Sequence, residues 1–395
     1  MKVAIVAEFY PRASDPVLGV WAHRQALAAR DAGADVRVLV LYRPVPPLAA
    51  ARAGPRAALS AVRRALAQPR HVTLDGIDVV YVPYLSPPRP SSYEDWGRWA
   101  TPSLALALRL LRRRFAFDLV HAHNAVPAAD AVRRAAARAP LIVSVHGGDV
   151  FHTAAGSARG ARTVKATFEH ARLVLANSAG TALRCRALGA AAGRTRVVRL
   201  GTDLPAARAE RYPQPTIVTT GHVIARKRHA DVLDAVALLS DRHPRLRYLV
   251  IGDGSELHAL RSRAVRLGIA DRIELPGQLP PAAALERTRR AWLLAMPSID
   301  EAFGVAYIEA MAGWVPAIGT RGEPGPEEIA SAGGGISLVA PGDVDALAAT
   351  IDGLLSDERV LSEAGDAARA TVSSAFSWSR CGAATVAAYE RALAR

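Results

Sequence analysis

The sequence predicts an α/β protein of two doubly wound, Rossmann-like domains that face a central cleft. The 395-residue chain exceeds what one hydrophobic core usually serves. Half of its residues are hydrophobic and 22% are charged, a globular balance that argues against disorder or a fibrous repeat. Short β-rich apolar runs alternate with amphipathic helical patterns almost from end to end, which is typical of parallel sheets built from βαβ units.

Apolar runs in both halves of the chain give the predicted strands. In the first half they cover residues 3–7, 36–41, 119–122, 141–145 and 173–176. In the second half they cover residues 217–219, 248–251, 293–296 and 315–318. The segment 201–215 is rich in turn formers and is the predicted linker. We therefore predict two Rossmann-like domains, over 1–205 and 206–375, and a last helix within 376–395 that returns to the first domain.

The net charge of +14 comes from the first half of the chain. Residues 1–205 carry 29 Lys and Arg against 13 Asp and Glu, whereas residues 206–395 carry 21 against 23. A positive field attracts anions, so the first half is expected to face nucleic acid, an anionic membrane surface or an acidic acceptor. The alternative is biased composition, because 47 of the 50 basic residues are arginine. Bias explains the use of arginine but not the asymmetry.

Two basic stretches of the first half, residues 48–70 and 104–114, have the composition of amphipathic helices. Either could lie on an anionic membrane surface. The favoured interpretation is that both are ordinary domain helices packed on their own sheet.

The expected location is the cytosol, including the inner face of the membrane. Cys185 and Cys381 lie far apart without CxxC spacing, which fits a reducing compartment. The apolar run that ends at Glu8 is too short for a signal peptide, and no 18-residue apolar stretch predicts a membrane span.

The strongest cluster of functional residues follows the predicted strand 293–296. A loop carries Glu301, and a helix is predicted to begin near Gly304. Free N–H groups and the helix dipole at that start favour a phosphate. Glu301 lies in the loop and Glu309 about two turns into the helix, so the two carboxylates can accept hydrogen bonds from different parts of one ligand. Sugar hydroxyls are suitable donors.

The E-x7-E arrangement within EAFGVAYIEAMA resembles the retaining glycosyltransferases of family GT4, which have the GT-B fold. The resemblance implies that residues 1–205 form the acceptor domain and residues 206–375 the nucleotide-sugar domain. It implies further that Glu301, Phe303 and Gly304 hold the donor sugar. It also implies that Glu309 binds the ribose and that Val305, at the helix start, contributes to the nucleotide diphosphate site. The alternative is a pair of solvated acids flanking a helix start, and the strand-loop-helix context favours the functional interpretation.

The second cluster follows the predicted strand 217–219 and reads GHVIARKRH. It resembles the family's G-R-L-x-x-x-K-G segment, whose basic residues neutralise the diphosphate. Lys227 falls on the lysine position beside Arg226, and it is one of three lysines in the chain, which suggests a need for a compact ammonium. Coincidence is the alternative. Two departures are His222 at the family's usual Arg and Arg228 at its Gly. Since His is largely neutral near pH 7, the diphosphate loses a permanent charge unless Arg226 or Arg228 supplies it.

Weaker matches support the same family. Gly19 lies in a segment that resembles the family's glycine loop at a helix start, where the backbone approaches the donor phosphates or the acceptor. His146 begins an H-G-x-D segment, which implies a place beside the donor sugar; the alternative is a turn-stabilising His with Asp149 as a helix cap. Gly252 matches the G-x-G turn near the nucleotide.

No cofactor is expected. His121 and His123 end a predicted strand on one face, so a metal site is conceivable, but no third ligand accompanies them in sequence. The family resemblance implies that the reaction requires no metal. The UDP- or GDP-linked sugar is then a substrate.

The resemblance implies a retaining hexosyltransferase with His146, Lys227 and Glu301 as catalytic residues. It would move a sugar from a nucleotide-diphosphate sugar to the hydroxyl of an acidic or lipid-linked glycan intermediate of the cell envelope, or of a natural product. Peripheral membrane association is an expected partner interaction, and nucleic acid binding is not. Two alternatives stay open: a sugar-nucleotide epimerase or other GT-B enzyme, and a basic membrane- or nucleic-acid-binding protein with an inactive catalytic lobe.

Overall fold

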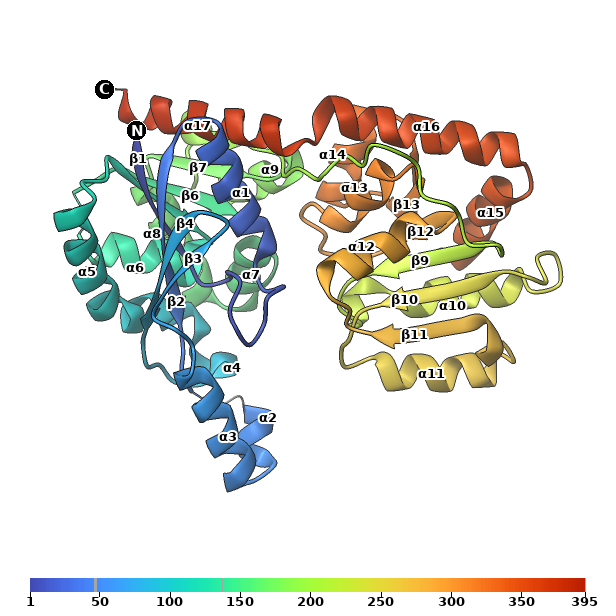
Figure 1. Cartoon of the computed structure of the whole chain (residues 1–395), viewed down its shortest axis with the longest axis horizontal. Helices are drawn as coiled ribbons and strands as arrows, with labels where there is room; N and C mark the ends of the chain where they lie inside the picture. The colour runs from blue at the N-terminus through green and yellow to red at the C-terminus, as the bar shows by residue number, and fades with distance from the viewer. Residues whose placement is uncertain (46–47, 137, 395) are drawn as a thin grey trace. The chain divides into compact units, whose positions relative to one another are not determined.

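The computed structural model describes residues 1–45, 48–136 and 138–394, and the chain forms two compact units (Figure 1). Unit 1 comprises Met1–Arg199 and Trp378–Arg395, and unit 2 comprises Leu200–Ser377. The sequence places these borders at 205/206 and 375/376, a few residues away. Each unit is a mainly parallel sheet covered by helices, which confirms the predicted α/β fold class of two Rossmann-like domains.

Unit 1 is built on an 8-stranded sheet of order β3-β4-β2-β1-β5-β6-β7-β8. Its strands are β1 (Lys2–Ala7), β2 (Asp35–Tyr42), β3 (His71–Leu74), β4 (Ile77–Pro83), β5 (Leu119–His123), β6 (Leu141–Val145), β7 (Leu173–Ala176) and β8 (Thr195–Val197). β1 pairs in parallel with β2 and β5, and β3 is antiparallel to β4. The five predicted strands are present. The sequence does not predict β3, β4 and β8, which lie at or next to the sheet edges, where runs are short or half-exposed.

Unit 1 also contains α-helices. They are α1 (Val20–Asp31), α2 (Leu48–Arg52), α3 (Pro55–Leu66), α4 (Arg89–Ser92), α5 (Trp96–Arg114), α6 (Asp130–Arg134), α7 (Ala154–Gly156), α8 (Ala158–His170), α9 (Ala179–Ala187) and α17 (Trp378–Leu393). The last of these packs against α1: a Cβ at Gly382 would lie 2.1 Å from the carbonyl oxygen of Ala28. Gln25 Nε2 also donates to Thr385 Oγ1 at 3.1 Å. The C-terminal helix therefore belongs to the first unit.

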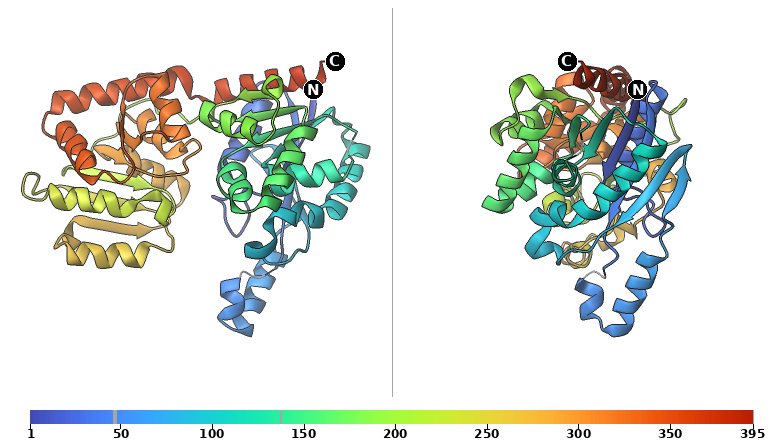
Figure 2. Two further views of the ribbon diagram at one scale, coloured as in Figure 1. Left: turned by 180° about the vertical axis from the view of Figure 1, so that it is seen from behind. Right: turned by 90° about the vertical axis from the view of Figure 1, so that its left-hand side faces the viewer.

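The two basic stretches of the sequence differ in the structure. α5 packs as expected and buries one face, including Leu104 and Leu108. The favoured interpretation is wrong for α3, because none of its residues is buried. Figures 1 and 2 show that α2 and α3 stand out from the rest of unit 1 rather than lying on its sheet. Among the described residues, no helix combines the length and apolar character needed to cross a bilayer.

Unit 2 is built on a 6-stranded sheet of order β11-β10-β9-β12-β13-β14. Its strands are β9 (Thr216–Thr220), β10 (Arg247–Ile251), β11 (Ile273–Gly277), β12 (Leu293–Ala295), β13 (Ala317–Thr320) and β14 (Ile336–Val339). Its helices are α10 (His229–Leu238), α11 (Leu257–Arg266), α12 (Pro281–Arg289), α13 (Val305–Ala312), α14 (Pro324–Ala332), α15 (Val344–Leu355) and α16 (Glu358–Ala375). All its strand pairs are parallel, so their carboxyl ends meet at one edge. The predicted strands are present, and the sequence does not predict β11 and β14, which flank the sheet.

Candidate functional site

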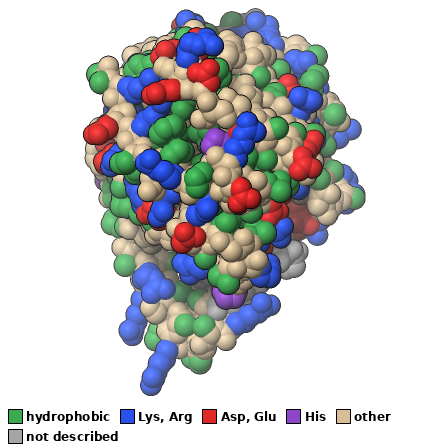
Figure 3. All heavy atoms as spheres, turned by 90° about the vertical axis from the view of Figure 1, so that its right-hand side faces the viewer, with side chains coloured by type: hydrophobic (Ala, Val, Ile, Leu, Met, Phe, Trp, Pro, Cys, Tyr) green, Lys and Arg blue, Asp and Glu red, His purple; other side chains and the backbone are tan. Residues whose placement is uncertain are grey.

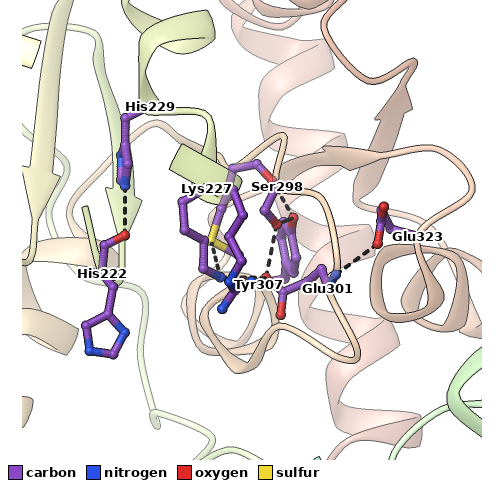
Figure 4. A network of polar contacts seen from close by, with 9 residues as sticks. His222, Lys227, His229, Ser298, Glu301, Tyr307 and Glu323 are labelled. Carbon is purple, nitrogen blue, oxygen red and sulfur yellow. Dashed lines mark hydrogen bonds and ion pairs between the residues drawn. The ribbon is translucent and has the colours of Figure 1, made fainter. Parts of the chain in front are cut away.

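A charged cluster lies at the carboxyl edge of the unit 2 sheet, where the loops after β9 and β12 meet (Figure 4). Lys227 Nζ lies 2.5 Å from Glu301 Oε2, and Arg226 Nη1 lies 3.7 Å from the same oxygen. Ser298 Oγ donates to Glu301 Oε2 at 3.0 Å, and the Tyr307 hydroxyl is 3.4 Å from Ser298 Oγ. We call these five residues the lysine–glutamate cluster. The structure thus joins two groups that lie 74 residues apart in sequence.

Backbone contacts hold this cluster in place. After β9 the chain makes a short 3-10 turn over Ala225–Lys227. The carbonyl of Arg226 accepts from the backbone N–H of Ile299 at 2.9 Å, which fastens the two loops together. Glu301 donates its own N–H to Glu323 Oε2 at 2.8 Å, and its carbonyl accepts from the N–H of Gly325 at 2.9 Å. Three successive strand ends therefore position the Glu301 carboxylate.

The Glu301 carboxylate is ionised although it is buried. Burial raises the pKa of such a group, but the Lys227 ammonium, with help from Arg226 and Ser298, holds the pKa of Glu301 below its usual value. The side chains of Lys227 and Glu301 are each 10% exposed. Two opposite charges in such a site satisfy each other, and an incoming anion would compete with the carboxylate for the ammonium.

Gly304 opens helix α13 next to the cluster. Its φ of 79° lies in the left-handed region, and a Cβ there would sit 2.4 Å from the ring of Tyr307, so glycine is required. The first helical residue is Val305, and the backbone N–H groups at such a start favour an anion. Phe303 is 2% exposed and packs edge-on against Phe376 at a centroid distance of 5.8 Å. Its side chain belongs to the core, so contact with a ligand is left to its backbone.

Two residues assigned to the nucleotide lie outside the lysine–glutamate cluster. Glu309 is half-buried on α13 and interacts electrostatically with Arg289. Burial lowers the pKa of Arg289, and the Glu309 carboxylate offsets part of that shift. Gly252 follows β10, and a Cβ there would lie 1.9 Å from the carbonyl oxygen of Gly221. Packing therefore requires a glycine at this position, because the backbones of the loops after β9 and β10 are in direct contact.

The two departures from the family pattern have different structural consequences. His222 is exposed, and its imidazole points away from the lysine–glutamate cluster (Figure 4). Its carbonyl oxygen lies 3.1 Å from Nε2 of the buried His229. Arg228 has a φ of 54°, the left-handed conformation that glycine adopts without cost, and its Nε donates to Asp231 Oδ2 at 2.6 Å. The basic groups that face Glu301 are therefore Lys227 and Arg226.

A cluster of neutral imidazoles lies at the carboxyl ends of β5 and β6 in unit 1. His123 Nδ1 and His146 Nε2 are 2.9 Å apart, with their rings stacked. His121 bonds through Nδ1 to the Tyr389 hydroxyl at 2.8 Å and through Nε2 to Ser144 Oγ at 2.7 Å. We call these five residues the histidine cluster. His121 and His123 thus have protein partners, and across the described residues no group of three or more His, Cys, Asp or Glu is placed to hold a metal ion.

Burial keeps the histidine cluster uncharged. It lowers the pKa of His146 to about 4 and that of His121 to about 3, and it holds the pKa of His123 well below its usual value. One of the facing nitrogens of His123 and His146 therefore donates its proton to the other. His146 Nδ1 and His123 Nε2 are buried without a hydrogen-bond partner in the described part of the chain.

Gly19 and the segment around Asp149 border the histidine cluster. Gly19 has a φ of 65°, begins helix α1, and passes so close to Phe9 that a Cβ would lie 2.1 Å from its carbonyl carbon. Trp21, in the first turn of α1, places its ring 6.1 Å from that of His146. The Asp149 carboxylate accepts the backbone N–H of Ala125 at 3.0 Å, and burial raises its pKa to about 6.

An open cavity of about 380 Å³ lies at this edge of unit 1. Residues that line it include Phe9, Arg89, Tyr93, Asn124, Asp149 and His152. Behind the cavity, the Tyr93 hydroxyl donates to Glu8 Oε2 at 2.8 Å, and burial raises the pKa of Glu8. The cavity offers aromatic rings, amide and carboxylate groups and one guanidinium, which are the groups that bind sugars and phosphates in proteins.

Sequence reasoning did not find several of these residues. Ser298 and Tyr307 lie within the quoted motif, but only the fold directs their hydroxyls toward Glu301 or Ser298. His123 was considered as a metal ligand, whereas the pairing of β5 with β6 makes it the partner of His146. For Trp21 the sequence does contain an indication of a functional place, because this residue lies two positions after Gly19 at the start of a helix.

Family models match most of the chain. Residues 203–371 match the model described as glycosyl transferases group 1, and residues 18–205 match the model described as glycosyltransferase family 4.

Curated relatives match over shorter stretches. An exopolysaccharide phosphotransferase of Streptomyces coelicolor is 36% identical over 39% of this chain and 16% of its own length. A GDP-mannose-dependent alpha-(1-6)-phosphatidylinositol monomannoside mannosyltransferase of Mycolicibacterium smegmatis is 28% identical over 46% of this chain and 50% of its own. The chain therefore spans half or less of these relatives.

A solved structure matches over almost the whole chain. The Anabaena protein HepE, in complex with UDP and glucose, aligns with a TM-score of 0.74 over 99% of both chains at 18% identity. At that identity, the likeness establishes the fold.

Proposed function

Because the chain belongs to glycosyltransferase family 4, whose members have the GT-B fold, we propose that it transfers a sugar from a nucleoside-diphosphate sugar to an acceptor hydroxyl with retention of configuration. The observation that carries this proposal is the lysine–glutamate cluster at the glycine-opened start of α13. It combines two cations, a helix N-terminus and a fixed carboxylate, which suit a diphosphate joined to a sugar.

The cations take the diphosphate in this proposal. Lys227, Arg226 and the free N–H groups at Val305 stabilise the negative charge that develops on the leaving group as the bond from the anomeric carbon to the phosphate oxygen breaks. Gly304 and the backbone of Phe303 hold the sugar together with Glu301. Glu309 accepts the ribose hydroxyls, and Gly252 brings its turn to the nucleotide. For unit 1, the family resemblance assigns Gly19 to the phosphates and His146 to the sugar.

No protein nucleophile is needed. The acceptor oxygen forms its bond to the anomeric carbon on the face from which the diphosphate leaves, and a diphosphate oxygen takes the acceptor's proton. Atoms and charges balance without a metal or other cofactor. Hydrogen bonds to the leaving oxygens in a partly dry site would lower the barrier by several kcal/mol.

The proposed donor and acceptor classes rest on what the relatives bind or use and on the positive charge of the first half of the chain. HepE binds UDP and glucose, and the Mycolicibacterium relative uses GDP-mannose and a phosphatidylinositol mannoside. We propose a UDP- or GDP-linked hexose as donor and an acidic or lipid-linked glycan as acceptor. The cavity lined by Arg89 and Asn124 is the proposed acceptor site, and the excess of basic residues in the first half favours a negative acceptor.

The test is a product-mass assay of the full chain with UDP- and GDP-linked hexoses and a panel of phosphorylated, lipid-linked and neutral acceptors. The expected result is an acceptor heavier by one hexose, with the anomeric configuration of the donor as read by NMR. Isomerised donor without acceptor would favour an epimerase, and a product carrying a phosphosugar would favour a phosphotransferase. Absence of binding to any nucleotide sugar in a thermal-shift titration would contradict the proposal.

A further inference from the structure

Helix α3 carries an apolar stripe that is largely exposed in the described part of the chain. Leu59, Val62 and Leu66 recur at helical spacing and so lie on one face of the helix. None of the residues of α3 is buried, and Leu59 and Leu66 are 51% and 64% exposed. A helix that packs on its own domain hides such a stripe, so α3 has an apolar face available to another partner.

The polar side of α3 and its flanks are uniformly basic. α3 carries Arg56, Arg63 and Arg64, with Arg52 before it and Arg70 after it. From residue 36 to residue 74 the sequence contains no Asp or Glu. These arginines form no ion pair within the described residues, and Arg64 bonds only to Ser60 Oγ at 2.6 Å. The whole segment therefore presents positive charge without internal neutralisation.

The segment also stands out from the rest of its own unit. Figures 1 and 2 show α2 and α3 projecting from unit 1 beyond the sheet. The space-filling view shows the same projection at its lower end, with basic and apolar side chains and no acidic ones on the visible face (Figure 3). The stripe is thus accessible without unfolding or moving the body of the unit.

We propose that α3 docks the protein on an anionic lipid bilayer. The leucines and Val62 enter the boundary between headgroups and acyl chains, while the arginines that flank the stripe bind lipid phosphates. A short cationic helix with a strong apolar face and low net hydrophobicity lies in that interface. Arginine is suited to it, because its guanidinium forms paired hydrogen bonds with phosphate and its stem covers apolar surface.

Other occupants fit less well. A nucleic acid backbone would use the arginines but would leave Leu59 and Leu66 in water. A second copy of α3 would cover the leucines but would bring the same positive charges together, which costs energy at ordinary salt. An anionic bilayer, in contrast, satisfies both sides of the helix. This inference goes beyond the proposed transfer reaction and does not rest on it.

The experiment is co-sedimentation of the full chain with vesicles of phosphatidylcholine alone and of phosphatidylcholine mixed with phosphatidylglycerol, at low and physiological salt. We expect binding to the mixed vesicles that weakens with salt. The variant Leu59→Gln/Leu66→Gln should lower partitioning about tenfold or more. The variant Arg56→Gln/Arg63→Gln should lower it about fivefold to tenfold per arginine at low salt.

Matched controls come from unit 2. Leu238 and Val265 are 59% and 67% exposed on α10 and α11, and Arg261 and Arg266 are exposed on α11. The variants Leu238→Gln/Val265→Gln and Arg261→Gln/Arg266→Gln should bind vesicles like the wild type. All variants should keep the thermal unfolding midpoint of the wild type, because the replaced side chains are exposed.

Three results would overturn the proposal. The first is a wild-type chain that does not bind the mixed vesicles at low salt. The second is equal vesicle binding by the wild type and the Leu59→Gln/Leu66→Gln variant. The third is arginine variants that lose binding to duplex DNA but keep vesicle binding, which would identify α3 as a nucleic-acid surface. Vesicle binding is read without donor or acceptor, so its failure and the failure of the proposed reaction are separate outcomes.

Discussion

The two polar clusters at the carboxyl strand edges are both buried, but one contains charged groups and the other neutral ones. In unit 2, the lysine–glutamate cluster buries two opposite charges 2.5 Å apart. In unit 1, the histidine cluster buries imidazoles in their neutral form, with His123 and His146 sharing one hydrogen bond. The first cluster keeps charge available for an anionic ligand. The second excludes charge and fixes the orientation of the ring of His146.

Because of this difference, the two clusters respond differently to mutation and to acid. Removal of one partner leaves a buried charge in unit 2 but only a buried dipole in unit 1, so the mutational cost differs. Acid is expected to destabilise the two clusters in different pH ranges, because the ordinary pKa of histidine is higher than that of glutamate.

The largest effect is expected from Lys227→Ala. It leaves the Glu301 carboxylate buried with only Arg226 nearby, and breaking such a pair costs about 3–5 kcal/mol of unfolding free energy. Urea unfolding at pH 7 measures the loss. The paired variant Lys227→Met/Glu301→Gln removes both charges and should recover most of it. If the single variant is as stable as the wild type, the ion pair does not contribute to the fold.

The same paired variant separates stability from activity. With both charges gone, turnover should fall by about 10²–10³-fold, because the leaving diphosphate loses a cation and the sugar loses its carboxylate. Initial rates with the donor found in the product-mass assay measure this. As a control, Arg261→Gln in α11 should leave turnover unchanged. Near-normal turnover in the paired variant would contradict the assignment of the donor site.

The histidine cluster should make stability depend on pH. Burial lowers the pKa of His146 to about 4, below the value of about 6.5 in an unfolded chain. As the pH falls, the unfolded state therefore takes up a proton before the folded state does. The contribution of neutral His146 to the free energy of unfolding is complete above about pH 6.5 and is lost as the pH falls toward 4. His146→Gln should reduce the loss between pH 7 and pH 5.5 by about 1 kcal/mol, measured by urea unfolding at both values.

His152→Gln is the matched control, because this exposed residue lies in the same unit. It should keep the pH dependence of the wild type. The lysine–glutamate cluster should behave differently: the lowered pKa of Glu301 confines its contribution to pH values above about 4.5, with loss as the pH falls further. An equal pH dependence of His146→Gln and wild type would show that His146 is not buried as a neutral group.

The smallest effect concerns Arg228, beside the charged cluster. Its left-handed φ of 54° is strained for a residue with a Cβ, whereas its ion pair with Asp231 offsets part of that strain. Arg228→Ala should lose the pair and keep the strain, while Arg228→Gly loses the pair and the strain together. We expect the glycine variant to be more stable than the alanine variant by about 1 kcal/mol in urea unfolding. The reverse order would mean that the backbone at this position is not strained.

Local patterns predicted much of the fold and the chemical groups of the site. The apolar runs at 3–7 and 141–145 became β1 and β6, because a strand buried on both faces is apolar along its whole length. The sequence does not predict β8 and β11, because a strand at a sheet edge is partly exposed and lacks a continuous apolar run. Glu301 and Lys227 were found through their motifs, yet each was assigned to a different part of the ligand, and their mutual contact was not foreseen.

The fold class, the family, and the presence of Lys227, Glu301 and the basic segment around α3 can be read from the sequence. These follow from periodicity, motif spacing and composition, which are local properties of a chain. Which groups meet and which faces stay exposed depends on how the elements pack. Strand order brings the ends of β9 and β12 together and so joins Lys227 to Glu301, and it places His123 beside His146. The exposure of α3 was likewise decided by packing, because an amphipathic pattern is the same whether its apolar face meets a sheet or a bilayer.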